Sequence, residues 1–98
     1  MPDAPAQAEI DHLLEFVGAS RCTFIRNGTR YAASEAKAHL QMKYRFAKLR
    51  LGSAEDFIRY LASGSSVSGE PYHVNCDGAD LLAGDWLGEE LRRYRQSK

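Results

Sequence analysis

The chain has 98 residues, of which 44% are hydrophobic and 27% are charged, as expected for one ordinary globular domain rather than a disordered chain. Its 13 Lys and Arg residues balance its 13 Asp and Glu residues, which argues against nucleic-acid binding because that function usually needs a strong basic excess. No apolar run approaches the roughly 20 residues that span a bilayer, so we expect no nucleic-acid partner and no membrane span.

The N-terminal region predicts a leader followed by a helix. Residues 1–7 are polar and rich in Pro and Ala, which is typical of a flexible leader, and residues 8–96 would form the single domain. Residues 8–17 repeat apolar side chains at the spacing of one helix face: Ile10, Leu13, Leu14 and Val17. Gly18 supplies a stop, because glycine takes the left-handed conformation without steric cost.

A β-hairpin is predicted next. Two short runs rich in β-branched and aromatic residues flank Asn27-Gly28, a pair that favours the type I′ turn because both residues tolerate positive φ. Side chains alternate between the two faces of a strand, so one face of the first strand would carry Cys22, Phe24 and Arg26.

Two helices, a loop and a late strand follow the hairpin. The first helix is expected to run from a Ser34 cap to about Leu51, and the second to begin after a Ser53 cap. Residues 63–71 are rich in Ser and Gly and predict a loop, and residues 72–76 alternate as a strand.

The chain would end in a turn and a last helix. Asp77-Gly78 turns the chain, and residues 85–95 form a final helix. The order α-β-β-α-α-β-α predicts an α+β fold in which a small antiparallel sheet, made of the hairpin and the late strand, packs against helices.

The two cysteines, Cys22 and Cys76, lie far apart in sequence and each belongs to a predicted strand. They form no C-x-x-C pair, so neither a redox motif nor a zinc site is indicated. We favour a structural disulfide in an oxidising compartment, and the alternative is two buried free thiols in a cytosolic protein. Closing a loop of about 55 residues would stabilise the fold by roughly 4 kcal/mol in the chain-entropy model.

Motifs spread over residues 9–95 carry a family resemblance. In chain order they are Cys22-x-Phe24-Ile25-Arg26-Asn27-Gly28-x-x-Tyr31, Ala36-x-x-His39-Leu40-x-x-Lys43, Asp56-Phe57-Ile58, Ser65-Ser66-x-Ser68-Gly69-x-Pro71-Tyr72-x-Val74-x-Cys76 and Trp86-Leu87. Together they resemble the YfeK-like family of small uncharacterised bacterial proteins, a domain of unknown function. The resemblance implies a periplasmic location with the export signal already removed, and it implies no activity. The chain departs from the family pattern near Ala83, where a Ser or Thr helix cap is expected.

Polar side chains at strand ends, helix edges and loops are the candidates for a ligand-binding site: Arg26, Asn27, His39, Lys43, Ser65, Ser66, Ser68 and Tyr72. His39 and Lys43 are four residues apart and share one helix face, and an arginine can clamp a carboxylate through two hydrogen bonds. The alternatives are a solvated helix edge, a simple loop connection and a surface arginine paired with an acid.

Three functions are compatible with these residues. The first is a non-enzymatic periplasmic binding or accessory domain for a small anionic or cell-envelope-derived ligand, or for a peptide segment of a partner. The second is a small hydrolase with a serine nucleophile and His39 as base, although no Gly-x-Ser-x-Gly elbow is present. The third is a protein-interacting envelope adaptor or inhibitor. We assign no catalytic residue, cofactor or metal, since the three histidines lack ligand spacing, and the sequence does not determine the oligomeric state.

Overall fold

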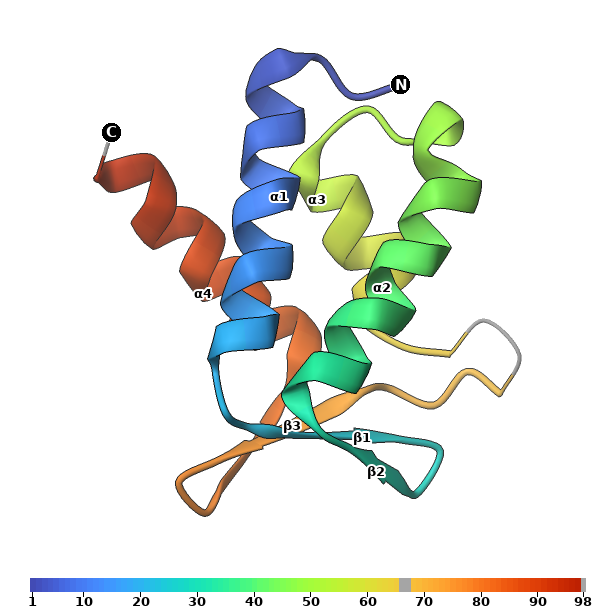
Figure 1. Ribbon diagram of the computed structural model, residues 1–98, viewed down its shortest axis with the longest axis vertical. Coiled ribbons are helices and arrows are strands. Elements are labelled where there is room, and N and C mark those ends of the chain that lie inside the picture. The colour runs from blue at the N-terminus through green and yellow to red at the C-terminus, as the bar shows by residue number, and fades with distance from the viewer. Residues whose placement is uncertain (66–67, 98) are drawn as a thin grey trace.

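The computed structural model describes residues 1–65 and 68–97, and it contains a four-stranded antiparallel sheet with helices on one side (Figure 1). Its elements are α1 (Ala4–Ala19), β1 (Thr23–Arg26), β2 (Thr29–Tyr31), α2 (Ala33–Ala47), a 3₁₀ turn (Lys48–Arg50), α3 (Ala54–Phe57), a π-helical turn (Ile58–Ala62), β3 (His73–Cys76), β4 (Ala79–Leu82) and α4 (Ala83–Gln96). The α+β class is therefore confirmed. No helix in the described ranges combines the length and the apolarity needed to cross a membrane.

Two tight turns of the same kind build the sheet. Asn27 and Gly28 have φ values of 51° and 79°, and Asp77 and Gly78 have 52° and 84°. Positive φ at both central residues is the mark of a type I′ turn, whose twist matches that of the flanking strands. The two hairpins meet where β1 pairs with β3, which sets the strand order β2-β1-β3-β4.

The strand β4 is absent from the expected element order, and this part of the expectation was wrong. Ala79–Leu82 contains no β-branched or aromatic residue, and all four of its residues are exposed. Its pairing with β3 therefore comes from the Asp77-Gly78 turn and from backbone hydrogen bonds rather than from side-chain propensity.

The helix α1 begins four residues earlier than expected, so part of the proposed leader at residues 1–7 is helical. Asp3 is the N-cap, and its carboxylate accepts a hydrogen bond from the Ala6 amide at 3.0 Å. Pro5 fits the first turn because the amides there have no partner within the helix.

The other helix boundaries also differ in detail. The Ser53 cap is confirmed, since its hydroxyl accepts a hydrogen bond from the Asp56 amide at 3.1 Å. Ser34 is not a cap, because α2 begins at Ala33 with Ala32 as its N-cap, and the Glu35 side chain accepts a hydrogen bond from the Ala32 amide. The last helix begins at Ala83, where a backbone hydrogen bond from the Ala83 amide to the Tyr72 carbonyl takes the place of a side-chain cap.

The predicted disulfide is present between Cys22 and Cys76, with 4.7 Å between the Cα atoms. It joins the residue before β1 to the last residue of β3, and so links two neighbouring strands across 54 residues of sequence. The paired residues Phe24 and Val74 lie on the helix-facing side of the sheet and belong to the hydrophobic core. The core therefore fills the space between this face and the helices.

Candidate binding site

A cavity of about 270 Å³ opens between α2 and the helix-facing side of the sheet. Buried aliphatic and aromatic side chains form much of its lining: Val17, Phe24, Ala36, Leu40, Ala62, Ala83 and Leu87. Apolar walls of this kind favour a ligand with a hydrocarbon or aromatic part, because its burial removes apolar surface from water.

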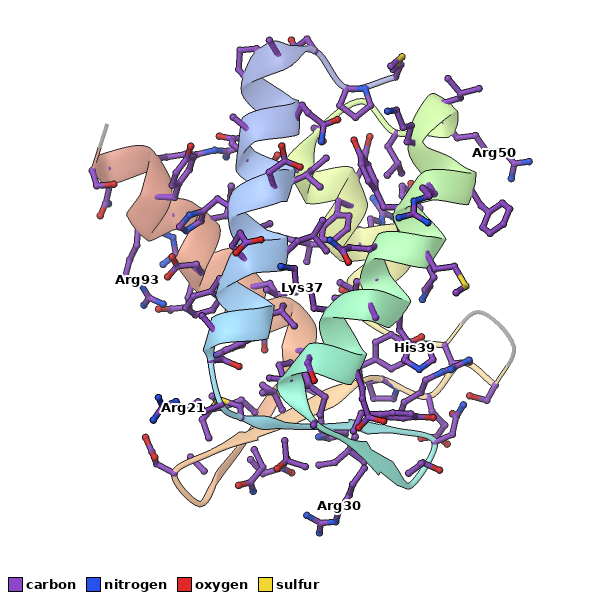
Figure 2. All side chains as sticks on the ribbon, in the orientation of Figure 1. Arg21, Arg30, Lys37, His39, Arg50 and Arg93 are labelled. Carbon is purple, nitrogen blue, oxygen red and sulfur yellow. A yellow bond between two sulfur atoms is a disulfide. The ribbon has the colours of Figure 1, made fainter. Side chains whose placement is uncertain are left out.

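Four of the predicted site residues lie together on this cavity. Arg26 comes from the end of β1, His39 and Lys43 come from α2, and Tyr72 comes from the segment before β3. Figure 2 shows His39 projecting from α2 above the β1–β2 hairpin. Segments far apart in the sequence thus bring polar groups to one apolar cavity.

Lys43 is held in place by two polar partners and one ring. Its ammonium donates hydrogen bonds to the Leu61 carbonyl at 2.6 Å and to the Tyr72 hydroxyl at 2.9 Å, and it lies 4.9 Å from the centre of the Tyr72 ring. Leu61 is next to the end of the π-helical turn, where carbonyls lack partners within the helix. These contacts fix the charge of Lys43 beside the cavity.

Arg26 carries a buried group that lacks a hydrogen bond. Its Nε atom is shielded from solvent and has no hydrogen-bond partner in the described part of the chain. Buried polar groups in folded proteins are nearly always paired, so such a donor calls for an acceptor. A ligand oxygen would supply one if the Arg26 side chain turned this atom toward the cavity that it lines.

The charge of this site is positive. Arg26 and Lys43 both line the cavity, and the described residues that line it include no Asp or Glu. In a partly desolvated site, an anion gains more from two cations than it would in water. The arrangement therefore suits a ligand that carries a carboxylate or phosphate.

His39 and Tyr31 form an aromatic part of the lining. Their ring centres are 5.1 Å apart in an edge-to-face arrangement. We did not include Tyr31 among the candidates, although a signal was available in the sequence. A two-residue turn at Asn27-Gly28 fixes the hairpin register, which pairs Tyr31 with Phe24 and turns both toward the helices.

The described serines do not join this cavity. Ser65 is buried in its own loop, where its backbone amide donates to the Glu70 carbonyl and its backbone carbonyl accepts from the Gly69 amide, each at 2.9 Å. Ser68 donates a hydrogen bond to the side-chain oxygen of Asn27 at 2.6 Å.

Asn27 and Ser68 line a different depression of about 530 Å³, beside the turn between β1 and β2. The predicted ligand residue Ser66 lies outside the described residues. The expected single polar site is thus divided, with Arg26, His39, Lys43 and Tyr72 on the cavity and Asn27 and Ser68 on the other depression.

The described residues include no group of three or more His, Cys, Asp or Glu side chains that could hold a metal ion. Both cysteines are consumed by the disulfide. The charged side chains among the described residues that line the cavity are Arg26 and Lys43, which suit binding of an anion.

Fold and site together define a small disulfide-closed α+β domain with an apolar cavity and a cationic edge. The chain belongs to a family of unknown function, DUF5329, whose sequence pattern matches residues 4–95. It is similar to an uncharacterised protein, YfeK, of Salmonella typhimurium strain LT2, with 37% identity over 71 residues. That match covers 71% of this chain and 59% of the relative, so the chain spans about three fifths of the relative's length. No solved structure matches the chain.

Proposed function

We propose that this domain is a non-enzymatic binding protein for a small amphipathic anion, a molecule with an apolar body and one carboxylate or phosphate. The observation that carries the proposal is that Arg26 and Lys43 line one apolar cavity without any lining carboxylate among the described residues. An uncharged apolar ligand would leave both cations without a counter-charge, and a fully polar anion would gain nothing from the apolar walls.

The proposed contacts follow from the donors at the cavity edge. The Arg26 side chain would turn its buried Nε toward the ligand anion and donate to it, since this atom has no other acceptor in the described part of the chain. Lys43 uses two of its three donors on Leu61 and Tyr72, and the third would point to the same anion. The apolar body of the ligand would lie against Phe24, Leu40 and Leu87.

We also propose that the domain works in the periplasm. The disulfide supports an oxidising compartment, because such bonds are rare in the reducing cytosol. The test is to fractionate the native bacterium, treat each fraction with an alkylating reagent without reductant, and measure the mass of the chain. An unalkylated chain in the periplasmic fraction is the expected result. An alkylated chain confined to the cytosol would overturn the location.

Titrations followed by the amide signals of the labelled protein test the ligand class. The probes are octanoate, its uncharged analogue octanamide, and acetate, which has the charge without the apolar body. We expect saturable shifts at residues around the cavity with octanoate and at least about tenfold weaker binding of the other two. Equal binding of octanoate and octanamide, or no saturable octanoate binding, would refute the proposal.

A matched pair of variants separates the cavity from general charge. Arg26→Gln removes the cation at the cavity, whereas Arg30→Gln removes an exposed arginine of the same hairpin that is paired with Ile25 and does not line the cavity. Octanoate binding should weaken about tenfold in the first variant and remain unchanged in the second. Equal effects would show that only overall charge matters.

The two other candidate functions have less support. A Ser/His hydrolase needs a serine within reach of His39, and neither Ser65 nor Ser68 lines the cavity that His39 lines. An adaptor role needs a docking surface, and the exposed apolar side chains Met42, Phe46 and Leu49 supply less area by themselves than a stable protein interface generally buries.

A further inference from the structure

One face of the helical segment from α2 to the 3₁₀ turn exposes three large apolar side chains. Met42 is 57% exposed, Phe46 is 84% exposed and Leu49 is 75% exposed. Their spacing of four and three residues places them on one side of a helix. We call these three residues the outer stripe. Leu40 and Tyr44 lie on the opposite, core-facing side, so packing within this domain does not account for the outer stripe.

The segment that carries the outer stripe has only positive charges. Residues 36–54 contain no Asp or Glu, and they contain five cations: Lys37, Lys43, Arg45, Lys48 and Arg50. Arg45 and Arg50 are both exposed and flank the outer stripe. Figure 2 shows Arg50 extending away from the body of the protein beyond the end of α2. Lys37 is paired with Glu15, and Lys43 is bonded at the cavity edge. Arg45 and Arg50 are therefore the exposed cations of this segment that lie beside the apolar side chains.

We propose that the outer stripe docks the domain on an anionic membrane surface. Apolar side chains that reach past the phosphate level, with Lys and Arg beside them, are what interfacial binding to anionic lipids requires. Three separate side chains along one helix form too narrow a patch for a stable protein interface, which generally needs more than roughly 1,000 Å² of buried surface. The two exposed arginines that flank the outer stripe, Arg45 and Arg50, complement lipid phosphates.

The position of Met42 links this surface to the cavity. Met42 belongs to the outer stripe and also lines the cavity, so the outer stripe and the cavity are adjacent on α2. An amphipathic anion leaving a membrane would then meet the cavity beside the docking surface. This link rests on the proposed ligand class, whereas the docking itself does not.

Cosedimentation with vesicles tests the docking. The vesicles contain either equal parts of phosphatidylglycerol and phosphatidylcholine or phosphatidylcholine alone, at low ionic strength. We expect binding to the anionic vesicles, weaker binding as salt is added, and little binding to phosphatidylcholine. An absence of binding to the anionic vesicles, or equal binding to both kinds, would overturn the proposal.

Paired variants test which residues are responsible. Phe46→Ser with Leu49→Ser changes two exposed side chains that do not line the cavity, and Leu81→Ser with Leu82→Ser is the matched control on β4. Vesicle affinity should fall by about tenfold or more in the first pair and by less than about twofold in the second. Equal vesicle affinity of the first pair and the wild type would refute the role of the outer stripe.

Two further double variants, which reverse the charge of exposed arginines, test the electrostatic part of the docking. Arg45→Glu with Arg50→Glu should abolish binding to the anionic vesicles, and Arg21→Glu with Arg30→Glu, at the sheet end of the molecule, should retain it (Figure 2). A dimer in solution that dissociates on changing Phe46 and Leu49 would assign the outer stripe to a second copy of this chain and overturn the proposal. Octanoate titration without vesicles measures ligand binding to the cavity alone. Failure of membrane docking is therefore distinguishable from failure of ligand binding.

Discussion

The Lys43 ammonium donates a hydrogen bond to the Tyr72 hydroxyl at 2.9 Å, which connects α2 to the segment before β3 across 29 residues of sequence. The same ammonium donates to the Leu61 carbonyl at 2.6 Å. One side chain thus joins three segments at the edge of the cavity, and it brings a positive charge there. Lys43 therefore contributes both to the stability of the fold and to the proposed ligand binding.

Lys43→Met keeps much of the aliphatic stem and removes all three donors. We expect the free energy of unfolding to fall by about 1–3 kcal/mol, because the Leu61 carbonyl and the Tyr72 hydroxyl lose a charged partner. Urea denaturation measures this loss. Tyr72→Phe removes only the hydroxyl, so it should cost less than Lys43→Met. A larger loss in Tyr72→Phe would contradict the account of Lys43 as the central partner.

Removal of the disulfide should destabilise the fold strongly. Cys22 and Cys76 are separated by 54 positions in the sequence, for which the chain-entropy model gives a loss of about 4 kcal/mol in the double variant Cys22→Ser, Cys76→Ser. Urea denaturation of the wild type with and without reductant should give the same difference as the double variant. Reductant should leave the double variant unchanged. A loss below about 1 kcal/mol would mean that the sheet alone holds these segments together.

The pH dependence of the free energy of unfolding should report on the ion pair between Glu55 and Arg95. Its guanidinium in α4 bonds Glu9 in α1 at 2.7 Å and Glu55 in α3 at 2.7 Å. The hydrogen bonds from Arg95 lower the pKa of Glu55 below its ordinary value of 4.5. A carboxylate with a lowered pKa in the folded state stabilises the fold above its unfolded pKa, and this stability is lost as pH falls through the folded pKa.

Glu55→Gln is the variant that isolates this effect. At pH 7 it should cost less than about 1 kcal/mol, because both partners are partly exposed and water screens the pair. The difference from the wild type should shrink as pH falls below 4.5. Glu89→Gln, in an exposed pair on α4, is the control for a general charge effect. A difference that grows on acidification would have the wrong sign and would refute the pairing.

Two glycines should respond to alanine in opposite directions. Gly78 has φ of +84° in the turn between β3 and β4, so Gly78→Ala should destabilise by about 1–2 kcal/mol. Gly88 lies inside α4, and an added Cβ would have no neighbour within 4 Å. Gly88→Ala should therefore stabilise by about 0.5–1 kcal/mol, since alanine is the better helix former. Thermal melts of both variants measure the two shifts, and shifts of the same sign would contradict this assignment.

Local sequence signals determined much of the fold. Asn27-Gly28 specified the first hairpin, Ser53 specified a helix start, and the two cysteines indicated the link between the strands. The turn and the helix cap depend only on residues that are neighbours in the sequence. The disulfide depends on cysteine, whose structural role in an oxidising compartment is to form such bonds. The short strand β4 escaped detection because its side chains are exposed and carry no strand propensity.

Only the tertiary structure decided which polar residues meet. From sequence, Arg26, His39, Asn27 and Ser68 were equal candidates for one site, yet the first two line the cavity and the last two line another depression. Pattern and turn chemistry determine which face of an element a side chain occupies. The packing of α2 against the sheet, which depends on the whole core, determines what that face meets.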